Sequence, residues 1–240
     1  MITERQQTIL ETIIEEYIKE ASPVGSKHLD AAFDFGIGPA MIRQEMAALE
    51  EEGYLASPHT SAGRVPTDKA YRFYISQKLS GKVKPLANRE QEKVKNAIGE
   101  AGDLNELARD IARLAAELSQ ELSVAGFIDR GTVFTSGLSR LIAEPELRDF
   151  ESARRLMRFV DELDGQFLDL WNKPFDRDLA VFIGEENPIR EMRNFTFITG
   201  HYNLPQGERG FLSLVGPRRM DYRRNIDLVR YISREIERIW

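Results

Sequence analysis

Apolar side chains near the N-terminus recur at intervals of three and four, which is the period of an amphipathic helix. This pattern predicts three helices, whose apolar stripes are Ile9, Leu10, Ile13, Ile14, Tyr17 and Ile18; Leu29, Ala32 and Phe33; and Ile42, Met46 and Leu49. Thr3 and Gln6 have the spacing of a capping box at the start of the first helix. Pro23 ends that helix, Ser26 is expected to cap the second, and Pro39 is expected in the first turn of the third.

The third predicted helix ends at Gly53. Opposite its apolar stripe it has a row of mostly small residues. The period of the helix places Ala40, Gln44 and Ala47 opposite that stripe, with Arg43 on the flank. Small side chains let a helix approach the major groove closely, and a glutamine amide can form two hydrogen bonds with adenine. The pattern therefore predicts the recognition helix of a helix-turn-helix domain. The acidic run that closes this helix, 50–52, is expected to be a solvated end that points away from DNA.

A strand that opens at Tyr54, a polar loop or hairpin over 57–66, and a helix capped by Thr67 are expected next. Taken alone, the loop is as readily a surface turn as a functional element. Directly after a helix-turn-helix pattern it is better interpreted as a wing, whose hydroxyls and backbone N–H groups bind phosphate while Arg64 reaches phosphate or the minor groove. The candidate contacts outside the recognition helix are Ser26, Lys27, His59, Thr60, Ser61, Arg64, Lys69 and Arg72.

The charge of the chain is unevenly distributed. The formal net charge is −6 at pH 7, which argues only weakly against DNA binding because the local charge at the contact face is what matters. Between residues 59 and 84 six basic residues stand against the single acid Asp68, a local excess of five. The sequence contains no cysteine, no signal peptide is recognisable, and no apolar run approaches the roughly 20 residues needed to cross a bilayer. A cytoplasmic protein is expected.

The second half of the chain has a mixed α and β pattern. The basic, proline-containing stretch 80–87 is the expected boundary, and Asn88 starts a helix. A following helix, with Asp103 and Glu106 as a second capping box, has a seam of apolar residues at spacings of three and four: Leu104, Leu107, Ile111, Leu114 and Leu118. The seam either pairs with a second subunit or covers a sheet of its own chain, and the second interpretation is slightly favoured.

Beyond residue 122 the sequence predicts short strands flanked by helices. The strand candidates are 124–128, 132–135, 179–183, 195–202 and 210–215, rich in β-branched and aromatic residues. One helix is expected to have a single apolar side made of Phe150, Ala153, Leu156, Met157, Val160 and Leu163. A last helix is expected to be capped by Asp221.

Candidate catalytic chemistry is absent from the sequence. The three histidines, His28, His59 and His201, have no metal-ligand spacing, and neither a P-loop nor a dinucleotide fingerprint is present. Glu185 and Glu186 are interpreted as a strand exit, and 216–219 as a turn stabilised by Asp221 rather than an anion site. We therefore expect no enzyme, no cofactor and no metal.

Long stretches resemble the HrcA family of heat-inducible transcription repressors. In the first half they are PVGSKHL, MIRQEMAALEEEGYL and PHTSAGRVPTDKAYRFY; in the second half they are SGLSRLIAEPELRDFE, VFIGEEN and LSLVGPRRMDYRRNID. The resemblance implies a repressor that binds double-stranded DNA at an inverted-repeat operator ahead of chaperone genes. It also implies a homodimer assisted by the chaperonin.

The chain departs from that family in two places. Where relatives usually carry threonine and asparagine in the third helix, this chain has Met41 and Gln44. Relatives are also longer, with a GAF-type α/β domain interrupted by an inserted dimerising domain; here the strand candidate ending near residue 127 is followed closely by one that includes Val133. The chain resembles a compact form that lacks the insert.

The expected fold is α+β, with a winged helix-turn-helix over 1–80, a helical linker and dimerisation candidate over 81–122, and a small GAF-like α/β domain over 123–240. Two functions remain open besides a chaperone-binding module without DNA specificity. The first is a dimeric, sequence-specific repressor of heat-shock genes. The second is a regulator controlled by a small molecule in the C-terminal domain, which an open pocket lined by Phe195, Phe197, Tyr202 and Phe211 would favour and a filled core would disfavour.

Overall fold

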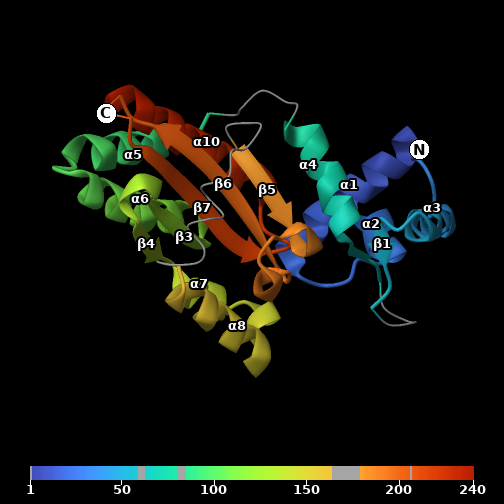
Figure 1. Cartoon of the computed structure of the whole chain (residues 1–240). Coiled ribbons are helices and arrows are strands. Elements are labelled where there is room, and N and C mark those ends of the chain that lie inside the picture. Colours follow the sequence, from blue (N-terminus) through green and yellow to red (C-terminus); the bar gives the residue numbers. More distant parts are fainter. Residues whose placement is uncertain (1, 59–62, 80–84, 164–178, 206) are drawn as a thin grey trace. The chain divides into compact units, whose positions relative to one another are not determined.

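The computed structural model describes residues 2–58, 63–79, 85–163, 179–205 and 207–240 (Figure 1). The chain divides into two compact units, Met1–Lys82 and Val83–Trp240, and each is described separately.

The first unit is built from four helices and a two-stranded hairpin. The elements are α1 (Glu4–Glu20), α2 (Ser26–Ala32), α3 (Pro39–Glu51), β1 (Leu55–Ala56), β2 (Val65–Pro66) and α4 (Asp68–Leu79). The capping box of Thr3 and Gln6 and the position of Pro39 in the first turn of α3 are confirmed. The expected cap of α2 is wrong by one residue. Ser26 is the first helical residue, and Gly25 precedes it with no side-chain cap.

The core of the first unit is formed by the predicted stripes. Its fully buried or nearly buried side chains include Ile9, Leu10, Ile13, Ile14, Leu29, Ile42, Met46, Leu49, Leu55, Tyr71, Tyr74 and Ile75. Two residues depart from the stripe of α2: Ala32, its last residue, is exposed, and Phe33, which follows it, is 36% exposed. The hydrophobic period therefore places the helices correctly and fails only at an end.

The hairpin is held by the chain that enters α2. Leu55 pairs with Pro66 and Ala56 with Val65, so part of the expected loop is strand. Val24 and Arg64 exchange both backbone hydrogen bonds, at 2.9 and 2.8 Å. A side chain at Gly63 would place its Cβ 2.4 Å from the backbone of Val24, so this approach requires glycine.

The second unit contains a five-stranded antiparallel sheet in the order β4-β3-β7-β6-β5. The strands are β3 (Leu122–Phe127), β4 (Thr132–Ser136), β5 (Leu179–Ile183), β6 (Phe195–Asn203) and β7 (Arg209–Pro217). The helices are α5 (Asn88–Glu100), α6 (Leu104–Ser119), α7 (Leu138–Ile142), α8 (Phe150–Asp161) and α10 (Tyr222–Ile239). Short 3₁₀ turns are η1 (Ile128–Arg130), η2 (Pro145–Leu147), η3 (Gly184–Glu186) and η4 (Arg190–Met192). All five strand predictions are confirmed within a few residues.

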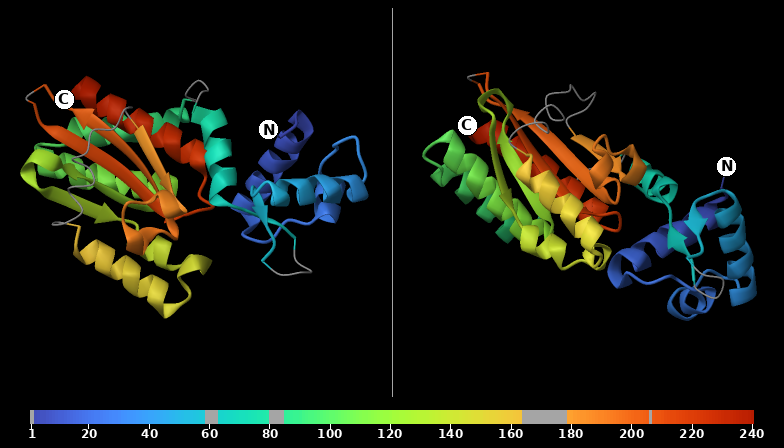
Figure 2. Two further views of the ribbon diagram at one scale, coloured as in Figure 1. Left: turned by 45° about the vertical axis from the view of Figure 1, so that its right-hand side comes forward. Right: turned by 60° about the horizontal axis from the view of Figure 1, so that its bottom comes forward.

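Helices cover both faces of this sheet (Figure 2). Helices α5, α6 and α10 pack together, with α6 on β3, β4 and β7 and α10 on β6 and β7. Leu107 and Ile111 of the α6 seam are fully buried there, so the seam covers the sheet of its own chain. Asp103 caps α6 by accepting a hydrogen bond from the backbone of Glu106, but Glu106 bonds to Gly102, so the reciprocal capping box is not formed.

The opposite face of the sheet is covered by α7, α8 and the 3₁₀ turns. One cluster contains Leu122, Val124, Leu141, Leu147, Leu156, Phe159, Leu163, Ile189, Met192, Phe195, Phe197, Phe211 and Val215. The prediction for the apolar side of α8 is partly wrong. Leu156 is buried together with Ser152 and Phe159, whereas Phe150 is 78% and Met157 40% exposed.

Candidate nucleic-acid interface

Helix α3 presents the row of residues that the sequence singled out. Ile42 and Leu49 are fully buried and Met46 is 4% exposed, which fixes the rotation of the helix. The side chains expected to read DNA point the other way: Ala40, Arg43 and Gln44 are exposed, and Ala47 is half-buried. From Ala40 to Ala47 the helix rises about 10 Å. The exposed row is therefore long enough to follow several base edges and contains no acidic side chain.

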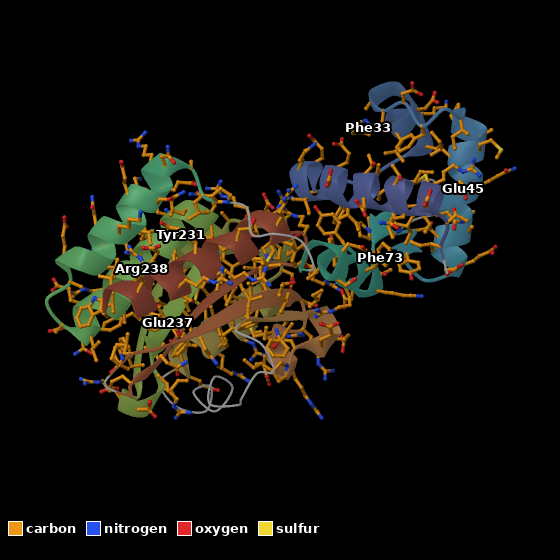
Figure 3. The ribbon with its side chains drawn as sticks, turned by 90° about the horizontal axis from the view of Figure 1, so that it is seen from above. Phe33, Glu45, Phe73, Tyr231, Glu237 and Arg238 are labelled. Atoms are coloured by element: carbon orange, nitrogen blue, oxygen red, sulfur yellow. The ribbon has the colours of Figure 1, made fainter. Side chains whose placement is uncertain are left out.

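An ion pair fixes the rotation of α3 from its other flank. Arg5 of α1 donates from Nε to Glu45 Oε1 at 2.8 Å, and Figure 3 shows Glu45 on α3. The guanidinium of Arg5, in the same unit, thereby compensates the negative charge of Glu45. This contact holds an acid away from the exposed row of α3.

Glu50, in the last turn of α3, binds both sides of the hairpin. The Ser57 hydroxyl, just after β1, donates to Glu50 Oε1 at 2.7 Å. Arg64, just before β2, places its Nε 2.8 Å from Glu50 Oε2, an ionic contact whose angle does not make it a well-formed hydrogen bond. Because Arg43 and Glu50 are seven residues apart, they lie on the same flank of α3. Arg64 is therefore held on the Arg43 side of the helix.

Lys69 lies at the opposite end of α3 from Ala40. Its ammonium donates to the backbone carbonyl of Glu52 at 2.6 Å and lies 4.2 Å from the ring centroid of Tyr54. A cation at this carbonyl complements the negative end of the helix dipole. The Thr67 hydroxyl also donates to the carbonyl of Gly53, at 2.8 Å. The Lys69 ammonium, which was expected to bind a DNA phosphate, thus has partners within the protein.

The start of α2 brings two further candidates to the surface. Lys27 is exposed and Ser26 is half-buried. The next residue, His28, is bound through Nε2 to Glu16 Oε2 at 2.9 Å. The Lys19 ammonium and, after it, His28 lower the pKa of Glu16, which favours its charged form. This contact orients α2 against α1 and leaves Lys27 facing water.

The remaining candidates divide into two groups. Arg72 is half-buried on α4. His59, Thr60 and Ser61, expected at the tip of the wing, lie outside the described residues. The contribution of Glu50 and Ser57 was missed, because the acidic run was interpreted as a solvated end. The spacing of Arg43 and Glu50 indicates only that the two side chains share a flank of α3; it does not indicate that the hairpin returns to Glu50.

The aromatic residues that would line a ligand pocket in the second unit are packed. Phe195, Phe197, Tyr202 and Phe211 are at most 1% exposed. The Phe159 and Phe197 rings meet edge to face with centroids 5.5 Å apart. These side chains fill a core, the arrangement that disfavours a small-molecule pocket at this position.

The described residues contain neither a candidate metal site nor a candidate membrane-spanning helix. Within them no three His, Cys, Asp or Glu side chains gather closely enough to hold a metal ion. Among the helices that the structure describes, none combines the length and the apolar content needed to cross a bilayer.

Comparison with known proteins points to one family. The family model for the HrcA protein C terminal domain matches residues 69–226. The heat-inducible transcription repressor HrcA of Streptomyces avermitilis is 42% identical over 135 residues, which cover 55% of this chain and 39% of that protein. The repressors of the same name from Desulfitobacterium hafniense and Geobacter sulfurreducens are each 27% identical, over 97% and 99% of this chain and 96% and 98% of theirs. A crystal structure of a hypothetical protein has the same fold, with a TM-score of 0.84, 20% identity, and coverage of 100% of this chain and 98% of that one.

Proposed function

Because the chain belongs to the HrcA family of heat-inducible transcription repressors, we propose that it represses chaperone genes by binding an inverted-repeat operator as a homodimer. It is a regulator and not an enzyme. Its partner is double-stranded DNA, and the family membership extends the proposal to support by a chaperonin.

The first unit is proposed to be a winged helix-turn-helix. In this arrangement α2 and α3 form the helix-turn-helix, α3 lies in the major groove, and the hairpin of β1 and β2 is the wing. One observation supports the assignment most strongly. The face of α3 opposite the buried Ile42 and Leu49 exposes Ala40, Arg43 and Gln44.

Each exposed residue of α3 has a proposed role. Gln44 bonds to an adenine edge and Arg43 to guanine or to an adjacent phosphate, while Ala40 and Ala47 permit close approach and contact thymine methyl groups. The phosphate contacts are proposed to come from Ser26, Lys27, His59, Thr60, Ser61, Arg64 and Arg72. Lys69 is proposed to serve first as support for the end of α3, because its ammonium already has a carbonyl and a ring as partners.

The second unit is proposed to be a compact GAF-like domain. The α6 seam is buried on its own sheet, so the dimer contact is expected elsewhere on the chain. Control by a small molecule among the sheet aromatics is the less favoured alternative, because Phe195, Phe197, Tyr202 and Phe211 are packed. Repression is then proposed to end when the folded dimer or its chaperonin support is lost.

The proposal is tested by comparing two classes of DNA. Inverted repeats that precede chaperone genes are titrated with the full chain beside random duplexes of equal length and at equal salt. The expected result is binding at least about 10³ tighter to the inverted repeat. Equal affinity for both classes would contradict the repressor and favour a module without DNA specificity.

A further inference from the structure

The N-terminal end of α3 exposes a large apolar side chain that the proposed DNA contacts do not use. Met41, the third residue of the helix, is 43% exposed, whereas Met46 in the same helix is 4% exposed. The other exposed large apolar side chain in the described part of the first unit is Phe33, at 36% (Figure 3). Phe33 follows α2, and its ring has a neighbour in Phe35, with centroids 6.1 Å apart. Met41 is thus the exposed large apolar residue on the helix proposed to read DNA.

The rotation of α3 places Met41 beside Gln44. The buried Ile42 fixes that rotation, and at about 100° per residue Met41 lies about 60° from Gln44 around the helix axis. Arg43 lies on the other side of Gln44, so the exposed face has an apolar flank and a basic flank. The helix rises about 4.5 Å from Met41 to Gln44, close to the roughly 3.4 Å between successive bases of one strand. The two side chains are therefore spaced to contact neighbouring base pairs.

The first turn of α3 is shaped for close approach to DNA. Its three residues, 39–41, are uncharged, and Gly38 precedes them without a side chain. A Cβ added at Gly38 would have no described atom within 4 Å, so the space in front of the helix is open. One turn beyond Met41 on the same flank, Glu45 is paired with Arg5 at 2.8 Å. This end of α3 can therefore bring Met41 close to the edges of the bases.

A methionine in this position is complementary to one group of the major groove. Thymine presents its C5-methyl group there, and apolar side chains recognise thymine by contact with that methyl. The thioether chain is unbranched and flexible, so it adapts its shape to such a contact. Cytosine presents an amino donor instead, which would lose water against Met41 without gaining a hydrogen bond. Met41 therefore favours thymine over cytosine.

We propose that Met41 contacts the methyl group of a thymine in the base pair next to the one that Gln44 reads. Met41 is then a further specificity-determining residue of the interface. Gln44 selects adenine through its amide, and Met41 selects the neighbouring thymine through its methyl group. This inference rests on the proposed function, because it requires α3 to lie in the major groove of an operator.

The test removes the methyl group from the DNA. The full chain is titrated with an inverted repeat that precedes a chaperone gene, and with copies in which one thymine of each half-site is replaced by uracil, which lacks only the methyl group. At one position the replacement is expected to weaken binding about fourfold for each half-site, which corresponds to the roughly 0.8 kcal/mol of one buried methylene-sized group. That position should adjoin the base pair at which Gln44→Ala relaxes the preference.

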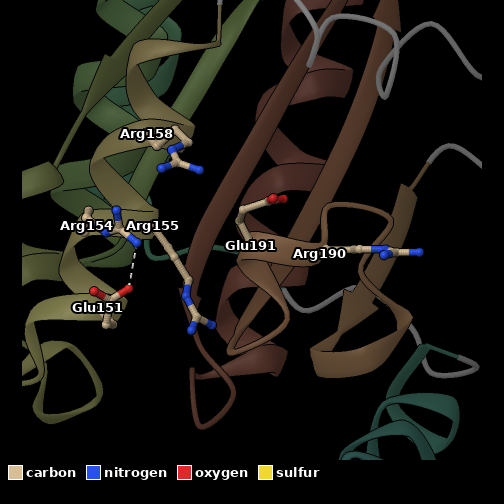
Figure 4. Close-up of a pocket in the computed structure, with 6 residues that line it drawn as sticks. All are labelled: Glu151, Arg154, Arg155, Arg158, Arg190 and Glu191. Carbon is tan, nitrogen blue, oxygen red and sulfur yellow. Dashed lines mark hydrogen bonds and ion pairs between the residues drawn. The ribbon is translucent and has the colours of Figure 1, made fainter.

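Three variants show whether Met41 makes this contact. The Met41→Ala chain should bind the thymine and uracil forms of this position equally, whereas Met41→Leu, which keeps an apolar side chain, should retain the difference. Met157→Ala is the matched control, because it shortens a methionine that is 40% exposed on α8 of the second unit. Figure 4 shows the stretch of α8 that contains this position, from Glu151 to Arg158. The control should keep the full effect of uracil.

Three results would overturn the role of Met41. One is an effect of uracil that is as large in Met41→Ala as in the parent at every thymine. Another is a thymine that depends on Met41 but does not adjoin the base pair read by Gln44. The third is an equal loss of the effect in Met157→Ala. Selective binding of the inverted repeat together with any of these results would leave the repressor function intact, whereas equal affinity for random duplexes would contradict that function itself.

Discussion

Arg64 Nε lies 2.8 Å from Glu50 Oε2, so an ion pair joins the segment before β2 to the last turn of α3. The Ser57 hydroxyl reaches the other oxygen of the same carboxylate. One acid thus fixes the hairpin relative to the helix that is proposed to read DNA. In the free protein Glu50 also forms an ion pair with Arg64, the residue that is proposed to bind a DNA phosphate.

Replacing Arg64 by alanine is expected to weaken DNA binding about equally for all sequences. One fewer neutralised phosphate should flatten the slope of log affinity against log salt by about 0.9. The measurement is a salt titration of operator and random duplex. An unchanged slope would show that Arg64 meets no phosphate.

Glu50→Gln is expected to strengthen DNA binding modestly. The amide can still accept the Ser57 hydroxyl, while the ion pair that Arg64 must leave is gone; exposed pairs of this kind contribute about 0.2–1 kcal/mol. Glu51→Gln removes the same charge from the neighbouring exposed position and serves as the control. The gain in DNA affinity should be larger for Glu50→Gln than for Glu51→Gln. It should disappear when Glu50→Gln is combined with Arg64→Ala.

Arg43→Ala and Gln44→Ala are each expected to cost about 1–3 kcal/mol of operator binding and to relax the base preference at one position. The reason is that both side chains are exposed on the face of α3 proposed to enter the groove. Gln77→Ala, at an exposed glutamine of α4, is the matched control. If the Gln44 variant discriminates operators as well as the parent, the assignment of Gln44 to base reading is wrong.

Lys69→Ala is expected to lower the free energy of unfolding by about 1 kcal/mol. The ammonium binds the carbonyl of Glu52 and covers the ring of Tyr54, and both contacts stabilise the end of α3. Urea denaturation measures the change. A variant of unchanged stability whose salt dependence of DNA binding is flatter would instead place Lys69 on a phosphate.

Glu121 makes stability depend on pH in the second unit. It is 8% exposed, and burial, followed by the nearby charge of Glu144, raises its pKa to about 8 against the smaller opposing effect of Arg219. The absence of a side chain at Gly216 makes room for it, since a Cβ there would lie 2.2 Å from Glu121 Oε2. The folded state therefore holds a proton that the unfolded state releases near its ordinary value of 4.5.

Because the folded state binds more protons in this window, stability should fall as the pH rises from about 4.5 to about 8. Glu121→Gln keeps the shape of the side chain without the charge. Its stability should equal that of the parent near the lower limit and exceed it by an amount on the order of a few kcal/mol near the upper one. Denaturation across this range measures the difference. Glu117→Gln, at a 52% exposed acid, is the control; a difference that did not grow with pH would contradict the burial of a neutral Glu121.

The sequence predicted the elements whose signals are local. The capping box of Thr3 and Gln6 marks the start of α1, Pro39 marks the start of α3, and Asp221 caps α10 as expected by accepting from the backbone of Arg224. The strands β5, β6 and β7 were found because β-branched and aromatic residues dominate them. Such signals depend on residues a few positions apart, and no tertiary contact is needed to interpret them.

Contacts between distant residues were not predictable in the same way. In α8 two apolar stripes compete, one through Phe150 and Met157 and one through Leu156 and Phe159, and only the packing against the sheet decides that the second is buried. The partner of Lys69 lies 17 residues away. The role of Glu50 likewise depends on where the hairpin returns, which periodicity does not contain.

The most direct test of the central claim is the selection of bound duplexes from a random pool by the full chain. A dimer with one α3 in each half-site is expected to recover an inverted repeat whose half-sites are about one helical turn of DNA apart, or a multiple of it. In the Gln44→Ala chain the preference should relax at one position of each half-site. A pool that stays random after repeated selection, or a recovered sequence that Arg43→Ala and Gln44→Ala leave unchanged, would contradict it.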